Sequence, residues 1–180
     1  YYLKPGFAYG GSCLPKEVRA VAHIAASAGV SLPLIEQLEA SNRAQIAEAM
    51  RLVRESGARR VAVLGLAFKP GTDDLRESPT LELIAALRDA GIEVSAHDPA
   101  VTAQTNIEGQ LSYVKHGAPG LAALATDLAD LIANDAVAAC LGAEAVIVTQ
   151  KNDTYAALAK AALDEGTPVV DVVRAFDRLP

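Results

Sequence analysis

The run RRVAVLGLAF at residues 59–68 constrains the fold of this chain more than any other feature. A basic pair precedes a continuous β-branched and aliphatic stretch, which is typical of a strand buried on both faces of a parallel sheet. Similar runs at 92–97, 145–149 and 168–173 alternate with helical patterns at 79–90, 121–131 and 155–165. This order predicts an α/β fold, in which helices cover a parallel sheet through right-handed crossovers.

Two helices are expected ahead of the sheet. The first covers residues 16–27 and stops at Gly29, and the second covers 34–55 and stops at Gly57. The second is long for a globular helix, so it either spans a domain interface, pairs with a partner chain, or lies buried in the core. Residues 100–120 have weak periodicity and are expected to form a surface insertion or irregular loop, and a short helix is expected at 134–141.

Composition excludes several classes of protein. Apolar residues make up 51% of the chain and aromatic residues only 4%, so the core is expected to consist of Ala, Val, Leu and Ile. The net charge of −6 argues against a general affinity for nucleic acid. No apolar run approaches the roughly 20 residues that cross a membrane, and no signal peptide is visible, so a cytoplasmic location is expected. The chain starts at Tyr1 without methionine, and we expect a C-terminal fragment.

Metal binding is not indicated. The two cysteines, Cys13 and Cys140, lie far apart and show no CxxC spacing. The three histidines are scattered, and none shares a short window with other ligand types. The sequence therefore predicts no metal site and no disulfide framework.

A glycine turn places a lone thiol before a helix, in the order Gly10-Gly11-Ser12-Cys13-Leu14-Pro15-Lys16-Glu17. The helix dipole and the Lys16 ammonium both favour a thiolate, which is the nucleophilic form of cysteine. A reactive Cys13 is the leading hypothesis, and the alternative is a small buried residue after a turn. A thiol hydrolase or transferase would additionally require His23 to approach Cys13.

The turn after the first strand lacks the dinucleotide fingerprint. Ala67, Phe68 and Pro70 occupy positions where GxGxxG would bring glycines to a pyrophosphate. The sheet is therefore expected to be Rossmann-like without an NAD turn, although ligands still bind at the carboxyl edge of such sheets. Lys69 and Arg76 flank that edge and each suits a phosphate. The alternative is solvated charge, with Arg76 paired to one of the nearby acidic residues Asp73, Asp74 and Glu77.

Two blocks of sequence resemble the UDP-glucose/GDP-mannose dehydrogenase family. Residues 2–16 are similar to the nucleophile loop of that family, and residues 65–79 are similar to its FK…DxRES segment. The resemblance implies a four-electron oxidation of a nucleotide-linked sugar, in which the C6 alcohol becomes a carboxylate and two NAD⁺ are consumed. It also implies that a cysteine captures the aldehyde as a thiohemiacetal and then carries a thioester, which water hydrolyses.

The resemblance assigns roles residue by residue. Cys13 would be the nucleophile, and Glu17 stands where the family has an aspartate that helps to activate the hydrolytic water. Lys16 and Arg76 would contact NAD, and Lys69 would contact the substrate. The sugar nucleotide would also be lined by residues of the first block, namely Tyr1, Tyr2, Lys4, Phe7 and Gly10.

The resemblance also implies an organisation. Residues 1–57 would form the nucleophile loop and the helical end of the central dimerisation domain, and residues 58–180 would form a Rossmann-like domain that binds the nucleotide sugar. The 34–55 helix resembles the dimer helix of the family, which favours an interface and a homodimer. The NAD-binding domain would precede Tyr1, so the isolated fragment would be inactive.

GDP-mannose is the favoured substrate and UDP-glucose the next. The tyrosine pair at 1–2, Phe7-Ala8 and the string TDDLRESP at 72–79 are more similar to the GDP-mannose members of the family. Lys4 departs from the arginine of those members, keeping the charge and losing the fork geometry. The alternative function is a non-catalytic module that binds a nucleotide sugar.

Overall fold

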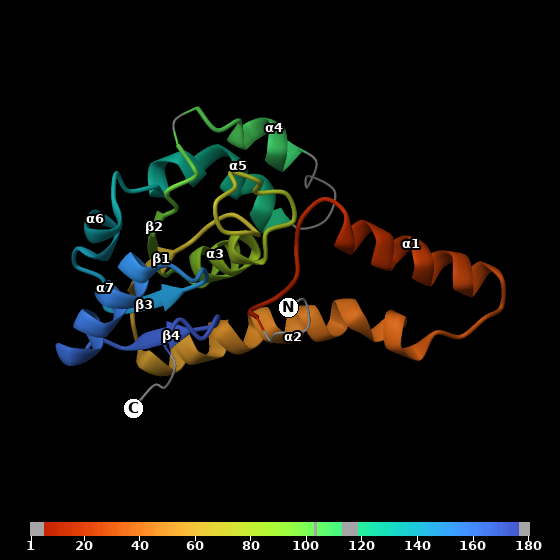
Figure 1. Cartoon of the computed structure of the whole chain (residues 1–180), viewed down its shortest axis with the longest axis horizontal. Helices are drawn as coiled ribbons and strands as arrows, with labels where there is room; N and C mark the ends of the chain where they lie inside the picture. Colours follow the sequence, from red (N-terminus) through yellow and green to blue (C-terminus); the bar gives the residue numbers. More distant parts are fainter. Residues whose placement is uncertain (1–5, 103, 113–118, 177–180) are drawn as a thin grey trace.

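The protein is an α/β structure built on one four-stranded parallel sheet (Figure 1). The computed structural model describes residues 6–102, 104–112 and 119–176. The strands are β1 (Arg60–Leu64), β2 (Glu93–His97), β3 (Ala145–Val148) and β4 (Val169–Asp171). They lie in the order β2-β1-β3-β4, and all three neighbouring pairs are parallel. The α/β fold expected from the sequence is confirmed.

Alternate residues of the strands face two separate hydrophobic layers. Val61 and Val63 pack in one core with α2 (Pro33–Ser56), α3 (Pro79–Asp89) and α5 (Pro119–Leu131). Ala62 and Leu64 pack on the opposite face with α6 (Ala136–Cys140) and α7 (Asp153–Asp164). Because β1 is covered on both faces, its sequence reads as a continuous apolar run and not as an alternating one.

The two N-terminal helices form a hairpin that projects from the sheet domain (Figure 1). The first helix is α1 (Leu14–Ser27), and the second, α2, ends at Gly57 in the left-handed conformation, as the sequence predicts. Only the second half of α2 is buried in the core, through Ile46, Ala49, Met50 and Val53. The first half of α2 extends beyond the sheet domain beside α1.

The prediction of an irregular loop at 100–120 is wrong in part. Helix α4 (Ile107–Ser112) lies inside that range, and α5 begins at Pro119, two residues before the expected start. Leu111 is buried, and Ile107, one turn earlier, packs against the same core. Because this short helix places two apolar residues in the core and has Gly109 at its centre, its pattern of apolar residues is too weak to predict a helix from the sequence.

Ser78 starts α3 without a capping hydrogen bond. It occupies the N-cap position with Pro79 next, a pair that typically begins a helix, but its side chain makes no capping bond. The Ser78 hydroxyl instead donates to the carbonyl of Leu66 at 2.6 Å. The start of α3 is thereby attached to the turn that follows β1. Among the described residues, no helix is long and apolar enough to span a membrane.

Candidate functional site

Cys13 lies at the N-terminus of α1, and its side chain is exposed. Its carbonyl accepts the first helical bond from the Glu17 amide at 2.9 Å, while Ser12 Oγ lies 3.8 Å from Cys13 Sγ. Pro15 stands in the first turn, where a missing N–H is harmless. The alternative of a buried structural cysteine is therefore wrong for Cys13.

The glycine turn before Cys13 packs directly on the loop after β1. The Gly11 amide donates to the Arg76 carbonyl at 3.1 Å. A Cβ on Gly10 would lie 2.2 Å from the Glu77 carbonyl oxygen, and one on Gly11 would lie 2.7 Å from the Phe68 ring. Only glycine allows this approach at either position, and Gly11 also has a φ of +89°. The two sequence blocks thus form one surface.

Asn42 attaches the glycine turn to α2. Its Oδ1 accepts from the Tyr9 amide and its Nδ2 donates to the Tyr9 carbonyl, both at 2.8 Å. One amide side chain therefore satisfies both backbone polar groups of Tyr9, which lies outside the sheet. The backbone just before Gly10 is held by α2 on one side and by the loop after β1 on the other.

The turn after β1 is closed by an internal anion. The buried carboxylate of Asp98, at the end of β2, accepts from the backbone amides of Leu66 and Ala67 at 2.8 and 2.9 Å. In a dinucleotide-binding sheet, amides at this turn face a pyrophosphate. Here a side-chain carboxylate occupies those donors, so the described turn does not suit a pyrophosphate, which agrees with the missing glycine fingerprint.

Residues after β3 complete the closure. The Gln150 amide nitrogen donates to Asp98 Oδ2 at 2.7 Å and to the Ala67 carbonyl at 3.0 Å. The Thr149 hydroxyl lies 3.0 and 2.8 Å from the carbonyl oxygens of Leu64 and Gly65. Parallel sheets usually bind ligands in the crevice between two such strands. Between β1 and β3, side chains that hydrogen-bond to the turn occupy this place, so a ligand would have to bind farther along the loop that follows β1.

That outer loop carries Lys69 and Arg76, both exposed. Arg76 makes a bidentate pair with Asp74 at 2.8 and 2.6 Å, as one of the sequence alternatives proposed. This pair holds the pKa of Asp74 below its ordinary value. The Arg76 pKa is raised by Asp74 first and, to a smaller extent, by the charge of Cys13. The Arg76 guanidinium therefore interacts mainly with Asp74.

Gln110 holds the inner side of this loop. Its Oε1 accepts from the Leu75 amide at 2.6 Å, and its Nε2 donates to the Asp73 carbonyl at 3.0 Å. Gln110 belongs to α4, the helix that the sequence does not reveal. The charged loop is consequently attached to the segment between β2 and α5.

The remaining predicted site residues differ in their exposure to solvent, and three of them lie outside the described residues. Lys16 and Glu17 form an exposed ion pair at 3.2 Å beside Cys13. Phe7 is buried in the main core, so little of its ring can meet a ligand. Tyr1, Tyr2 and Lys4 lie outside the described residues.

The proposed approach of His23 to Cys13 is wrong. Helix α1 runs without interruption from Leu14 to Ser27, so ten residues separate the two side chains along its axis. At about 1.5 Å per residue this is on the order of 15 Å, far beyond hydrogen-bond reach. His23 is exposed on α1 and does not pair with the thiol.

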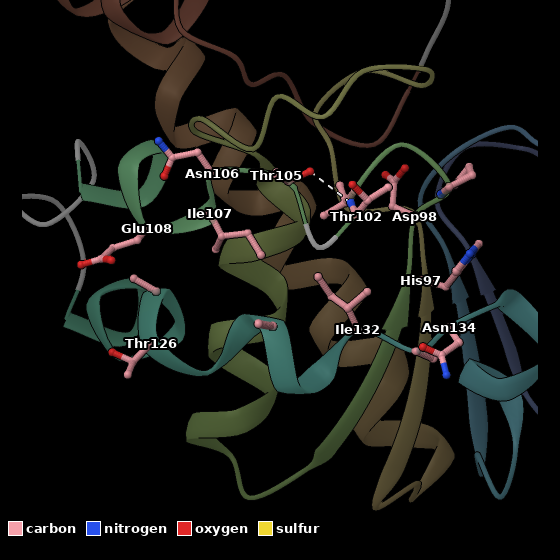
Figure 2. Close-up of a pocket in the computed structure, with 15 residues that line it drawn as sticks. His97, Asp98, Thr102, Thr105, Asn106, Ile107, Glu108, Thr126, Ile132 and Asn134 are labelled. Carbon is pink, nitrogen blue, oxygen red and sulfur yellow. Dashed lines mark hydrogen bonds between the residues drawn. The ribbon is translucent and has the colours of Figure 1, made fainter.

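A separate cavity of about 920 Å³ lies at the carboxyl end of β2, between α4 and α5. Figure 2 shows side chains from three segments around it, including His97 and Asp98 at the end of β2, Asn106 and Glu108 at the start of α4, and Thr126 on α5. Among the described residues, its lining contains two carboxylates, those of Asp98 and Glu108, and no lysine or arginine. None of the predicted site residues that the structure describes lines this cavity.

The sequence does not reveal the residues that hold the site together. Asn42, Gln110, Gln150 and Arg19 act through tertiary contacts that have no local pattern. Asp98 had one available signal, because an acidic residue at the end of the second strand is a recurring feature of Rossmann-like sheets. Its position before Pro99 by itself indicates only the end of a strand.

The chain matches two domains of one protein family. Residues 62–178 match "UDP-glucose/GDP-mannose dehydrogenase family, UDP binding domain", and residues 1–44 match the central domain of the same family. The parallel sheet, the glycine turn and the loop after β1 therefore define a nucleotide-sugar dehydrogenase type of structure. The chain belongs to the UDP-glucose/GDP-mannose dehydrogenase family.

Individual relatives point in the same direction. The GDP-mannose 6-dehydrogenase of Pseudomonas syringae pv. syringae is 39% identical over 96% of this chain and 38% of its own length. A UDP-glucose 6-dehydrogenase of Pseudomonas aeruginosa is 43% identical over 57% of this chain and 24% of its own length.

A solved structure of GDP-mannose dehydrogenase from P. aeruginosa superposes with a TM-score of 0.77 at 32% identity. It covers 100% of this chain and 39% of its own length. The chain thus spans about two fifths of the length of such relatives.

Proposed function

We propose that this chain is the C-terminal part of a nucleotide-sugar 6-dehydrogenase, which oxidises the sugar C6 alcohol to a carboxylate with two NAD⁺. The observation that carries the proposal is the packing of the Cys13 turn on the loop after β1, which brings the turn that carries an exposed thiol onto the backbone of Arg76. GDP-mannose is the favoured substrate and UDP-glucose the next, in line with the names of the relatives. In this proposal, residues 1–57 form the nucleophile loop and the helical end of the central domain, and residues 58–180 form the domain that binds the nucleotide sugar.

In this mechanism the Cys13 thiolate adds to the C6 aldehyde carbon, and the carbonyl oxygen takes up a proton to give a thiohemiacetal. Oxidation of that adduct leaves a thioester on Cys13 Sγ. Water then attacks the thioester carbon, and the thiolate leaves as the carboxylate forms. Glu17, one helical turn beyond Cys13, would accept the proton of that water. Its ion pair with Lys16 keeps its carboxylate on the same exposed side of the helix start.

Bound NAD⁺ supplies the hydride acceptor for such an oxidation. Among the described residues, Lys16 and Arg76 are the exposed cations beside Cys13 and suit its pyrophosphate. The turn after β1 does not suit it, because its amides bind Asp98. We therefore propose that most of the cofactor site lies in residues beyond this chain, and that the isolated chain is inactive.

Lys69 would contact the substrate from the same loop, together with Tyr1, Tyr2, Lys4 and Gly10. Phe7 would line the substrate site only through its backbone, because its ring is buried in the main core. The half of α2 that projects from the sheet domain, with an exposed Leu34, suits a homodimer interface formed by the 34–55 segment. A cytoplasmic location stays a prediction from the sequence.

The test uses the full-length protein that carries these residues. Cys13→Ser should lower formation of the sugar acid by about 10³-fold or more with GDP-mannose and NAD⁺, because the hydroxyl is a far weaker nucleophile. Cys140→Ser, at a half-buried position, is the matched control and should retain activity within about twofold. Normal acid formation by Cys13→Ser would exclude the mechanism.

The alternative is a nucleotide-sugar-binding module without catalysis. It is favoured by one observation, the closure of the β1 turn by Asp98, which leaves the described chain without a dinucleotide turn. Calorimetry of the chain with GDP-mannose and UDP-glucose tests it. Binding by a full-length protein that produces no acid would support the module and contradict the dehydrogenase.

A further inference from the structure

Two consecutive residues hold the chain on both sides of Cys13. On the N-terminal side, the Gly11 amide donates to the Arg76 carbonyl at 3.1 Å. On the C-terminal side, the Arg19 guanidinium donates to both carboxylate oxygens of Glu77, at 2.9 and 2.7 Å. The thiol therefore lies between two attachment points, both on the loop that follows β1.

The ion pair between Arg19 and Glu77 joins three elements. Arg19 lies on α1, Glu77 lies in the loop before α3, and Arg19 Nη1 also donates to Glu39 Oε1 on α2 at 3.2 Å. The Glu77 side chain is only 19% exposed, so water competes little for its carboxylate. The bond to Glu77 is the largest cause that raises the Arg19 pKa above its ordinary value. A bidentate guanidinium pair fixes orientation as well as distance.

The backbone at Glu77 supports the same contact. Glu77 has a φ of +47°, a left-handed conformation that residues other than glycine adopt at a cost. In this conformation its carbonyl oxygen lies against Gly10, while its carboxylate reaches Arg19 on α1. One residue thus contacts the chain before Cys13 through its backbone and the chain after Cys13 through its side chain.

We infer that Arg19 and Glu77 are a positioning pair that sets the Cys13 thiol against the loop carrying Arg76. This inference rests on the proposed function, in which Cys13 attacks a substrate held by that loop. Neither residue is assigned to the chemistry itself. They act through the placement of helix α1, because a rotation or shift of its first turn moves Sγ relative to the substrate carbon.

A second ion pair supplies a control that distinguishes the positioning of Cys13 from a general contribution to the stability of the chain. Arg51 makes a comparable bidentate pair with Glu48, and also contacts Glu55, but all three residues lie on α2. That pair joins no two elements and lies away from Cys13 in the sequence. Arg51→Ala is therefore the matched control for the loss of an exposed bidentate arginine.

The first measurement needs no activity. In the 180-residue chain, amide exchange at Gly11 reports whether the glycine turn stays on the loop. Arg19→Ala and Glu77→Gln should each raise the Gly11 exchange rate about tenfold or more, while Arg51→Ala should leave it within about twofold. Unchanged exchange at Gly11 in both pair variants would overturn the inference, whatever the activity of Cys13.

The second measurement uses the full-length protein. Arg19→Ala should lower kcat about tenfold with the KM for the sugar nucleotide within about twofold, since the pair orients the nucleophile and does not contact substrate. Arg19→Lys should recover part of the loss, and Arg19→Ala with Glu77→Gln should be no worse than either single variant. Independent, additive losses, or a kcat of Arg19→Ala within about twofold of that of the parent, would overturn the inference.

The outcomes also separate the inference from the function on which it rests. If Cys13→Ser keeps normal turnover, the proposed mechanism fails, and the Gly11 exchange result still decides whether the pair positions the turn. If Cys13→Ser is inactive while both pair variants retain kcat, the dehydrogenase mechanism stands and the positioning role is wrong.

Discussion

The carboxylate of Asp98 accepts a hydrogen bond from the backbone amide of Leu66 at 2.8 Å, across the carboxyl ends of two neighbouring strands. The same oxygen also accepts from Ala67 and Gln150, and Oδ1 accepts from Ala100 at 3.0 Å. Four N–H donors thus compensate one buried negative charge. The Asp98 carboxylate occupies the amides that would bind a phosphate in a dinucleotide-binding turn. The sheet therefore holds the loop of the candidate site in place and does not itself bind a phosphate at this turn.

Replacement of this charge should destabilise the chain. Asp98→Asn leaves a weaker acceptor and adds a donor that faces the amides of Leu66 and Ala67. We expect a loss of about 2–3 kcal/mol in the free energy of unfolding, measured by urea denaturation followed by circular dichroism. Asp130→Asn, at an exposed position on α5, is the control and should change stability by less than about 0.5 kcal/mol. Equal effects of the two changes would contradict the role of Asp98.

The approach of Gly10 to Glu77 makes a second prediction. A Cβ at position 10 would lie 2.2 Å from a backbone oxygen and 2.8 Å from the Pro79 ring, and neither is the end of a flexible side chain. Gly10→Ala should therefore displace the turn and cost about 2 kcal/mol in the free energy of unfolding, seen as a lower Tm.

Gly6 supplies the matched control for this change. A Cβ on Gly6 meets no atom within 4 Å, and the residue is exposed. Gly6→Ala should leave the Tm within about 2 °C of the parent chain. A tolerated Gly10→Ala, with the Tm and the amide exchange of Gly11 unchanged, would show that the two sequence blocks do not need this close contact.

Glu82 should make the stability of the chain depend on pH in a defined direction. Burial raises the pKa of Glu82, and the nearby carboxylates of Glu77 and Glu39 add to the effect. Because the folded state disfavours the ionised form, its contribution to stability is present below the ordinary glutamate pKa of 4.5 and is lost as pH rises through the higher folded value.

Glu82→Gln tests this sign. The variant should unfold at a higher temperature than the parent at pH 7, by on the order of 2 °C, and the difference should vanish below about pH 4. Glu93→Gln, at an exposed position on β2, controls for the removal of one negative charge. A variant that is less stable than the parent at pH 7 would mean that ionised Glu82 is stabilised by Arg19 and Arg43 more than burial opposes it.

Two tyrosines should respond in opposite ways to loss of the hydroxyl. The buried Tyr155 hydroxyl donates to the His97 carbonyl at 2.9 Å and lies 3.0 Å from His97 Nδ1. Since its single proton goes to the carbonyl, Nδ1 must donate the second bond. Tyr155→Phe removes the acceptor of His97 Nδ1 and one of the two bonds to the His97 carbonyl, which still accepts from the Gly65 amide at 2.8 Å. It should cost about 1–2 kcal/mol in the free energy of unfolding.

Tyr9 is the contrasting case. Its hydroxyl oxygen is buried and has no hydrogen-bond partner among the described residues. Tyr9→Phe should therefore leave the chain equally stable or slightly more stable, by up to about 1 kcal/mol. Chemical denaturation of both variants in parallel gives the comparison. A larger loss for Tyr9→Phe than for Tyr155→Phe would contradict the hydrogen-bond arrangement around both rings.

Most of the fold follows from local patterns in the sequence. The four strands, the long helix that ends at Gly57 and the start of α3 at Ser78 all have signals within a few residues, namely buried runs, a left-handed glycine and a Ser-Pro pair. Helix α4 has no comparable signal, because the burial of Ile107 and Leu111 depends on their packing against the main core and is not evident from the neighbouring sequence. Short elements of this kind are stabilised by packing more than by their own propensity.

By itself, the sequence determined which residue types are available to the site and where they lie along the chain, including Cys13 at a helix start and the cations Lys69 and Arg76. Only the tertiary structure decided which of them meet. It brings Gly10 and Gly11 onto the loop at Arg76 and Glu77, pairs Arg19 with Glu77 across 58 positions, and closes the β1 turn with Asp98. The physical reason is that hydrogen bonds and close contacts between distant segments depend on the packing of whole elements, which no local period in a sequence encodes.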